Sequence, residues 1–108
     1  MINSEVGSDM TIEKKTNGAA LEIALEGRLD TMTAPELEKE LNGTLGSADS
    51  LVLDFSKLDY ISSAGLRVLL SAHKVMGAKG GMKVKNVNEI VQEVFEVTGF
   101  ADILNIER

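Results

Sequence analysis

Two adjacent serines occupy a position where a phosphate group or a nucleophile could act. Residues 62–66 read Ser-Ser-Ala-Gly-Leu, between an apolar strand-like run at 51–55 and an apolar helix-like run that begins at Ser63. The first N–H groups of a helix lack intrahelical partners, and the helix dipole is positive at that end. A phosphate on a hydroxyl there is electrostatically tolerated and can stay exposed to a partner. The pattern therefore indicates a phosphorylation switch rather than a catalytic centre.

The alternative explanation is that Ser63 only caps the helix, because serine is a preferred N-cap residue. Two features favour a functional role. Two hydroxyls occupy a turn where one would suffice, and the small residues Ala64 and Gly65 follow them. Glycine has poor helix propensity, but in the first turn it lets the backbone of another molecule approach closely. We therefore expect residues 62–65 to form a flat, open surface.

Serine-based catalysis lacks a suitably placed base. His73 is the only histidine, and it lies ten positions after Ser63 on what reads as one helix. At 1.5 Å per residue the two side chains would be separated by roughly 15 Å along the helix axis. A nucleophile and its base must be about 3 Å apart, and the serine does not stand in a G-x-S-x-G elbow. The chain is therefore not expected to be an enzyme, and His73 is expected to be a packing or rim residue.

Cofactor and metal sites also lack their usual residues. The sequence contains no G-x-x-x-x-G-K-[ST] phosphate loop, and the glycine-rich residues 77–81 precede a strand instead of opening a helix. With one histidine, no cysteine and scattered carboxylates, no cluster has metal-ligand spacing. We expect neither a cofactor nor a metal.

Length and charge restrict the partners. The chain has 108 residues, enough for one domain, and 44% of them are hydrophobic while 4% are aromatic, which predicts an aliphatic core. Its net charge of −6 argues against direct binding to nucleic acid or to an anionic membrane. No apolar run approaches the ~20 residues of a membrane span, and the N-terminus does not read as a secretory signal. We expect a cytoplasmic protein.

The apolar pattern of the first half predicts two strands and a helix. Residues 10–15 and 19–26 read as strands joined by an Asn-Gly turn, and the second strand alternates between apolar and polar residues. Thr33, Pro35 and Glu36 indicate a helix start, with Thr33 and Glu36 as a capping box. A loop at 46–50 is expected to follow this helix.

The second half predicts a βαβ unit and a further helix. Residues 51–55 read as a buried central strand, 56–60 as a connection, 63–76 as a helix ended by Gly77 in a left-handed cap, and 82–87 as a parallel strand. Asn88 is expected to cap a third helix. That helix should turn Ile90, Val91, Val94 and Phe95 inward, before a helical turn at 100–104 and an edge strand at Ile106.

Three segments resemble the STAS domain, and more narrowly the small bacterial anti-sigma factor antagonists. They are Gly-Arg-Leu-Asp at 27–30, Leu-Asp-Phe-Ser at 53–56 and Tyr-Ile-Ser-Ser-Ala-Gly-Leu at 60–66. The resemblance extends from Met10 to Ile106. It implies an α/β fold: a single STAS-like domain at 10–108 with a mixed central sheet of four to five strands and about four helices. Residues 1–9 are expected to form a flexible N-terminal tail.

The resemblance also implies a partner-switching function. Such an antagonist binds a kinase-type anti-sigma factor and thereby regulates sigma-factor-dependent transcription. The kinase phosphorylates a serine at the start of the second helix, which breaks the complex, and a PP2C-type phosphatase restores it. The serine two positions before the motif glycine is Ser63. The alternative acceptor is Ser62, at a place where several relatives carry aspartate.

The expected partner surface combines the loop after the second strand with the start of the helix at 63. Its members are Asp30, Thr31, Thr33, Ser62, Ser63, Ala64, Gly65 and Arg67. An alternative function is a STAS docking subunit of another complex, such as a lipid-transport or stressosome-like assembly. The chain is expected to be a monomer or a weak dimer.

Overall fold

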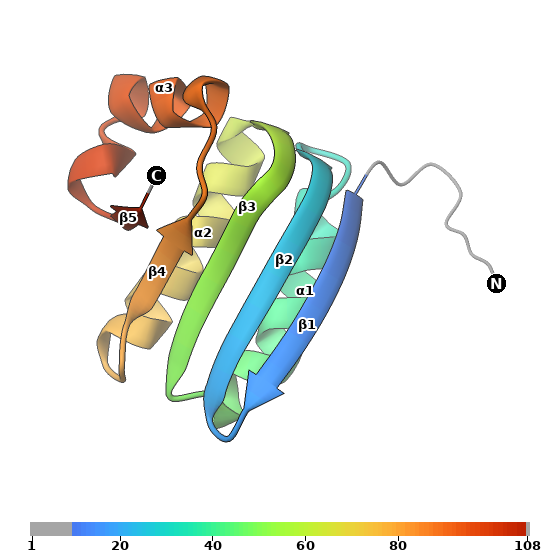
Figure 1. The fold of residues 1–108 in the computed structure, drawn as a ribbon, viewed down its shortest axis with the longest axis vertical. Helices are drawn as coiled ribbons and strands as arrows, with labels where there is room; N and C mark the ends of the chain where they lie inside the picture. Colours follow the sequence, from blue (N-terminus) through green and yellow to red (C-terminus); the bar gives the residue numbers. More distant parts are fainter. Residues whose placement is uncertain (1–9, 108) are drawn as a thin grey trace, which may run out of the picture.

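A five-stranded mixed sheet forms the centre of the structure, a computed structural model that describes residues 10–107. The strands follow one another in the order β1-β2-β3-β4-β5 (Figure 1). They are β1 (Met10–Asn17), β2 (Ala20–Leu29), β3 (Ser50–Ile61), β4 (Met82–Lys85) and β5 (Asn105–Glu107). Three α-helices connect them, α1 (Ala34–Thr44), α2 (Ser63–Gly77) and α3 (Glu89–Thr98), with short 3₁₀ turns at Leu45–Ser47 and Phe100–Asp102. This architecture confirms the predicted fold class; the predicted tail at 1–9 lies outside the described residues.

The strand directions follow from the connections. β1 and β2 form an antiparallel hairpin with Asn17 opposite Ala20, and Gly18 between them has a φ of 65°, as the Asn-Gly signal predicts. β2, β3, β4 and β5 are parallel to one another. Because α1 and α2 cross behind the same face of the sheet, that face is covered and the opposite face is open (Figure 1).

The core lies between the sheet and these two helices. Alternate residues of β2 and β3 point into it, including Leu21, Ile23 and Leu25 from β2 and Leu51 and Leu53 from β3. The helices contribute a second set of fully or nearly fully buried side chains: Leu37 and Leu41 from α1, and Leu66, Leu69, Ala72 and Met76 from α2. The core is aliphatic, as the composition predicts, and within the described residues the fully buried aromatic rings are those of Phe55 and Phe95.

The central strand is longer than predicted. β3 continues to Ile61, so residues 56–60 are part of the sheet instead of a connection. The pairing of β3 with β2 shifts register twice, between Ala24 and Glu26 and between Gly27 and Arg28. These irregularities break the alternation after Phe55, so that the next buried residues are Leu58 and Ile61. A period-two search therefore misses this half of the strand.

Helix and strand ends in the second half also differ from the prediction. Gly77 belongs to α2 and does not form a left-handed cap, since Ala78 at the C-cap is right-handed and the positive φ, 93°, occurs at Gly81. β4 ends at Lys85 because Asn86 has a φ of 61°. Ile90, predicted to point inward, is 59% exposed, whereas Asn88 caps α3 as predicted by accepting a hydrogen bond from Val91 N.

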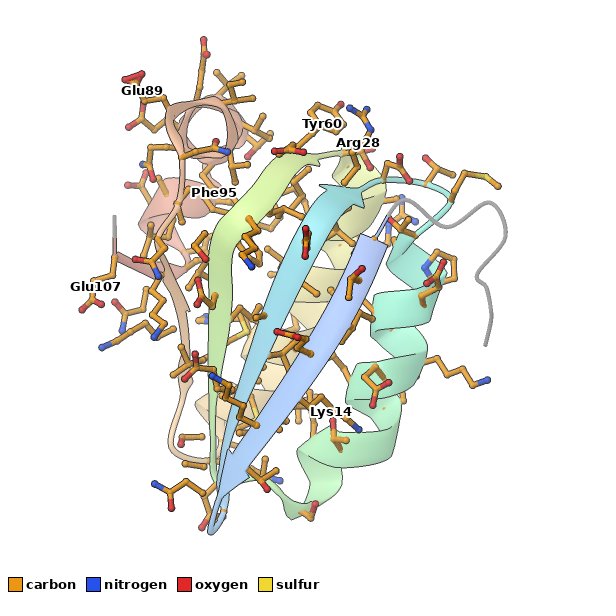
Figure 2. The ribbon with its side chains drawn as sticks, turned by 45° about the vertical axis from the view of Figure 1, so that its right-hand side comes forward. Lys14, Arg28, Tyr60, Glu89, Phe95 and Glu107 are labelled. Atoms are coloured by element: carbon orange, nitrogen blue, oxygen red, sulfur yellow. The ribbon has the colours of Figure 1, made fainter. Side chains whose placement is uncertain are left out.

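The two edges of the sheet carry charge or are short. β1 presents three consecutive charged residues, Glu13, Lys14 and Lys15, and Lys14 forms an ion pair with Glu40 of α1 (Figure 2). β5 at the other edge has three residues. Charge on β1 and the short length of β5 therefore discourage pairing with another strand at both edges.

A lysine from the turn after α2 holds the end of α1. Lys79 Nζ donates to the carbonyl oxygens of Leu45 at 2.6 Å, Ala48 at 3.0 Å and Gly46 at 3.2 Å. These carbonyls follow the C-terminus of α1, where the helix dipole is negative and a cation is favoured. Lys79 thus joins two crossover connections that are distant in sequence.

Replacing Lys79 by methionine should lower the free energy of unfolding by about 1–2 kcal/mol, because the apolar stem remains while three carbonyls lose a charged donor. Urea denaturation of the purified chain measures this. Lys39→Met on the exposed face of α1 is the matched control and should change the free energy by less than about 0.5 kcal/mol. Equal effects of the two substitutions would contradict the assigned role of Lys79.

Candidate functional site

The start of α2 is fastened to the end of β2. Ser62 is the N-cap residue, with φ −102° and ψ 177°, and its backbone N–H donates to Leu29 O at 2.9 Å. The Ser62 carbonyl then accepts the first helical hydrogen bond, from Leu66 N at 3.0 Å. The first turn of α2 is therefore positioned by the strand beside it.

The two serines differ in accessibility. Ser62 Oγ is buried and has no hydrogen-bond partner, and it does not cap α2. Ser63 is the first residue of the helix, as predicted, so it is not the N-cap residue of the alternative explanation, and its side chain is exposed. The first turn of α2 contains no acidic side chain. A macromolecule approaching this surface therefore meets the Ser63 hydroxyl and not that of Ser62.

Gly65 has an internal role. It is buried, and a Cβ at this position would lie 2.7 Å from Leu29 Cγ and 2.9 Å from Ile61 Cγ1. The absence of a side chain thus lets α2 pack directly on the ends of β2 and β3. This corrects the expectation that Gly65 opens the surface to another molecule. Gly65 faces the core and is buried, so a partner cannot contact it directly.

The loop between β2 and α1 is held by its own polar groups. Asp30 Oδ1 accepts hydrogen bonds from Met32 N at 3.0 Å and Thr33 N at 3.1 Å. Thr33 Oγ1 donates to Arg28 O at 2.7 Å and accepts from Asp30 N at 2.8 Å. The prediction that the Thr33 side chain caps α1 is wrong, because this side chain makes no cap hydrogen bond to the helix. Thr33 is 1% exposed, so its hydroxyl is not accessible to a partner. The hydrogen bonds of this hydroxyl to the backbone of Arg28 and Asp30 instead hold the loop in place.

Electrostatics favour the charged form of Asp30. Partial burial raises the pKa of this carboxyl, but the hydrogen bonds from Thr33 and Met32 and the charge of Arg28 outweigh that effect, so the pKa lies below its ordinary value. Arg28 Nε lies 3.6 Å from Asp30 Oδ2, and its guanidinium stacks 4.6 Å from the centre of the Tyr60 ring (Figure 2). The loop is therefore ordered and negatively charged at neutral pH.

A hollow between α1 and α2 brings several predicted residues together. Thr31, Ala64 and Arg67 line a cavity of about 260 Å³. Pro35 and Glu38 from α1 also line it. Met32 is 75% exposed at the rim of the same loop. The structure thus gathers Thr31, Ser63, Ala64 and Arg67 at one edge, while Thr33 and Gly65 support it from below.

The remaining polar groups of residues 10–107 include the single histidine and the acidic side chains. Ser63 and His73 lie on the one helix α2, as predicted, and His73 Nδ1 is buried without a hydrogen-bond partner. Within residues 10–107 no group of three or more histidine, cysteine or acidic side chains has the geometry to hold a metal ion. Over the same residues, none of the helices is long and apolar enough to cross a bilayer.

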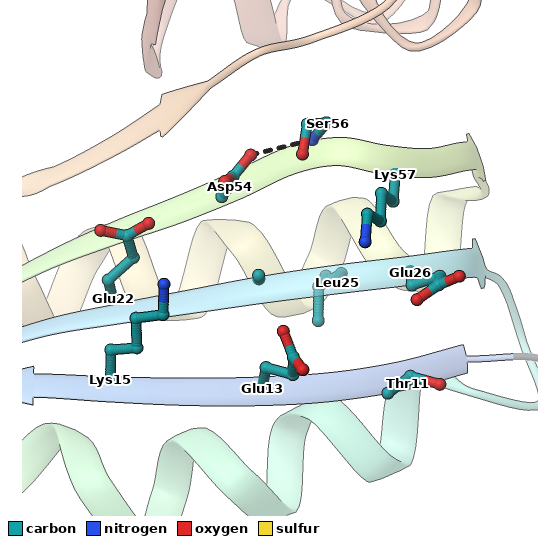
Figure 3. Close-up of a pocket in the computed structure, with 10 residues that line it drawn as sticks. Thr11, Glu13, Lys15, Glu22, Leu25, Glu26, Asp54, Ser56 and Lys57 are labelled. Carbon is teal, nitrogen blue, oxygen red and sulfur yellow. Dashed lines mark hydrogen bonds between the residues drawn. The ribbon is translucent and has the colours of Figure 1, made fainter.

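The open face of the sheet carries a second, shallow cavity of about 150 Å³ (Figure 3). Its charged lining mixes both signs: Glu13, Glu22, Glu26 and Asp54 with Lys15 and Lys57. The alternating signs do not select an anion or a cation.

Asp54 is held by two hydrogen bonds. Its Oδ1 accepts from Ser56 N at 2.9 Å and from Asn86 Nδ2 at 3.0 Å. Partial burial raises the pKa of the Asp54 carboxyl. The hydrogen bonds from Asn86 and Ser56 and the charge of Lys85 lower it by more, so the pKa lies below its ordinary value.

Comparison with known proteins identifies the family. The sequence model of the STAS domain matches residues 11–108. The chain belongs to the STAS domain family. This chain is 39% identical over 84 residues to BtrV of Bordetella bronchiseptica, a protein assigned to the anti-sigma factor antagonists. The alignment covers 76% of this chain and 72% of BtrV. This confirms the resemblance drawn from residues 27–30, 53–56 and 60–66.

Solved STAS structures share the whole fold. An anti-sigma factor antagonist from Mycobacterium paratuberculosis superposes with a TM-score of 0.84 at 22% identity, covering 97% of this chain and 90% of that one. The Bacillus cell fate determinant SpoIIAA, solved in the phosphorylated form, gives a TM-score of 0.70 at 17% identity, covering 89% and 90% of the two chains. These likenesses establish the fold of the chain.

The contact of Gly65 with Leu29 and Ile61 predicts that Gly65→Ala lowers the free energy of unfolding by about 1–3 kcal/mol, because the methyl group has no room. Gly43→Ala is the matched control. It is also a helical glycine, but a Cβ there meets nothing within 4 Å. That substitution should raise stability by about 0.5–1 kcal/mol. Thermal denaturation of both variants provides the comparison, and a neutral or stabilising Gly65→Ala would refute the packing role.

Proposed function

We propose that the chain is an anti-sigma factor antagonist that binds a kinase-type anti-sigma factor and is switched off by phosphorylation of Ser63. The observation that carries this proposal is the exposed Ser63 hydroxyl on the first residue of α2, beside a cavity lined by Thr31, Ala64 and Arg67. A PP2C-type phosphatase would reverse the modification in the cytoplasm. The membership of the family and the name of the relative BtrV support this assignment.

The acceptor is Ser63 rather than Ser62. A kinase must bring the γ-phosphate in line with the attacking hydroxyl oxygen, so that oxygen has to be accessible. Ser62 Oγ is buried in the described structure, whereas Ser63 is exposed. The Ser62 hydroxyl would have to leave its buried position before it could react, whereas Ser63 is already exposed.

Phosphorylation acts on the interface and leaves the fold intact. A phosphoserine adds about −1.5 to −2 charges at pH 7. At residue 63 the added charge lies at the positive end of the α2 dipole, which favours an anion. The cost falls instead on the bound partner, since a close contact would have to accommodate the bulk of a phosphate and remove its water.

Arg67 gives the switch a second component. It lies four residues after Ser63, on the same side of α2, and both side chains are exposed. Among residues 10–107 Arg67 has no ion-pair partner, so its guanidinium is free to contact a partner through the cavity it lines. Side chains spaced i and i+4 on a helix meet, and arginine binds phosphate with paired hydrogen bonds. Phosphorylation therefore draws Arg67 away from the partner.

The switch predicts opposite effects of two Ser63 substitutions. Ser63→Asp should weaken binding to the cognate kinase-type anti-sigma factor at least tenfold, which is about 1.4 kcal/mol, whereas Ser63→Ala should bind constitutively. Isothermal titration of purified proteins measures both affinities. Ser47→Asp, which adds the same charge at an exposed serine beyond α1, is the control and should bind as the unmodified chain does. Equal affinity of the two Ser63 variants would overturn the proposal.

The same partner identifies the acceptor serine. Incubation with the kinase and ATP should add one phosphate by intact mass, and peptide mapping should place it on Ser63. Ser62→Ala should still be modified, while Ser63→Ala should not. Modification that survives Ser63→Ala would show that Ser62 is the acceptor.

The pairing with Arg67 predicts a lower second pKa for the phosphate. In chains carrying phosphoserine at 63, ³¹P NMR titration should give a pKa about 0.2–0.4 units higher after Arg67→Gln, the equivalent of an exposed i,i+4 ion pair. Lys74→Gln, two turns further along α2, should leave it unchanged. An identical phosphate pKa in all three proteins would exclude the pairing, without affecting the choice of acceptor.

A further inference from the structure

Helix α3 carries more apolar surface than the fold buries. Val91 and Phe95 point into the core, and Figure 2 shows Phe95 toward the sheet while Glu89 points away from it. In contrast, Ile90 is 59% exposed and Val97 is 80% exposed, and Val94 between them is half-buried. These exposed residues explain why apolar periodicity wrongly predicted Ile90 to be in the core. They form a surface that the described residues leave without a cover.

The two exposed apolar residues lie in one line with the half-buried Val94, which also packs against the core. Ile90, Val94 and Val97 follow the spacing i, i+4 and i+7, which places them along one side of a helix of 3.6 residues per turn. Single exposed apolar residues are normal on protein surfaces, but a continuous apolar line along two turns of a helix is typical of a binding surface. We call Ile90, Val94 and Val97 the α3 stripe.

An acidic ridge borders the α3 stripe. Glu89, Glu93 and Glu96 are all exposed, and at 100° per residue they fall on the side of the helix next to Ile90 and Val97. The helix contains no lysine or arginine. The stripe is therefore flanked by negative charge that no residue of α3 neutralises, and it selects for a partner with the opposite sign.

We propose that the α3 stripe docks an amphipathic helix of another protein, whose apolar ridge is flanked by lysine or arginine. The residues of the stripe have helical spacing, so the apolar ridge of a partner helix can pack between Ile90 and Val97. The basic flank would lie against Glu89, Glu93 and Glu96, where it supplies the missing positive charge. This surface uses none of the residues of the Ser63 surface, so the two proposals stand or fall separately.

Charge argues against two other occupants. A second copy of the chain, paired through α3, would bring two sets of three glutamates together in a protein whose net charge is already −6. A bilayer with anionic lipids would meet the same repulsion. A basic amphipathic helix removes the apolar stripe from water and compensates the ridge at the same time.

The test uses two synthetic 18-residue helical peptides with the same leucine ridge, one flanked by lysine and one by glutamate. Each is titrated into the ¹⁵N-labelled chain. The lysine-flanked peptide should shift the amide signals of residues 89–98, and the glutamate-flanked peptide should bind at least tenfold more weakly. Equal binding of both peptides, or shifts confined to other residues, would overturn the proposal.

Matched variants separate the stripe from general attraction between a cationic peptide and an acidic protein. Ile90→Ser with Val97→Ser should reduce affinity for the lysine-flanked peptide at least tenfold with the net charge unchanged. Val75→Ser, at an apolar residue of α2 that is 46% exposed, should leave it unaltered. Equal losses in both variants would contradict the assignment. Sedimentation showing a dimer that Ile90→Ser with Val97→Ser disperses would make a second copy the occupant and refute it.

Discussion

The close contact between α2 and the ends of β2 and β3 determines how the proposed switch is presented. It depends on a position without a side chain, Gly65, packed against Leu29 and Ile61, and on the hydrogen bond from Ser62 N to Leu29 O. Together these contacts fix the rotation of the first helical turn. One serine is thereby turned inward with its hydroxyl buried, and the next is turned outward.

The surface around Ser63 is largely preorganised. On one side the β2–α1 loop is closed by the Asp30 carboxylate and the buried Thr33 hydroxyl, and on the other α2 is fixed by its contact with the strands. A partner that binds ordered groups loses less conformational entropy than one that must order them. A rigid surface also makes a local charge more effective, since the loop cannot relax to accommodate a phosphate. In the proposed switch, both the affinity for the partner and its loss on phosphorylation would arise from the same rigidity.

Much of the fold was accessible from sequence because its signals are local. The Asn-Gly hairpin, the alternation of β2, the βαβ order and the Asn88 cap each depend on neighbouring residues. The errors occurred where tertiary structure overrides the local pattern. Register shifts hid the second half of β3, a buried threonine served the loop instead of α1, and α3 carries apolar residues that the core does not accept. At the candidate site the sequence predicted that a helix begins at Ser63, as the structure has it. It could not show which serine is buried, because that follows from packing between elements distant in sequence.

The edges of the sheet have a further consequence for the chain in a crowded cell. An edge strand presents unpaired backbone N–H and C=O groups, which can pair with a strand of another molecule and so lead to fibrous aggregates. Here one margin is lined by Glu13, Lys14 and Lys15, and the other ends after three residues. Association through strand addition is therefore discouraged at both margins. Contacts with other proteins are left to the helices and loops, where they can form and dissolve without the hazard of irreversible polymerisation.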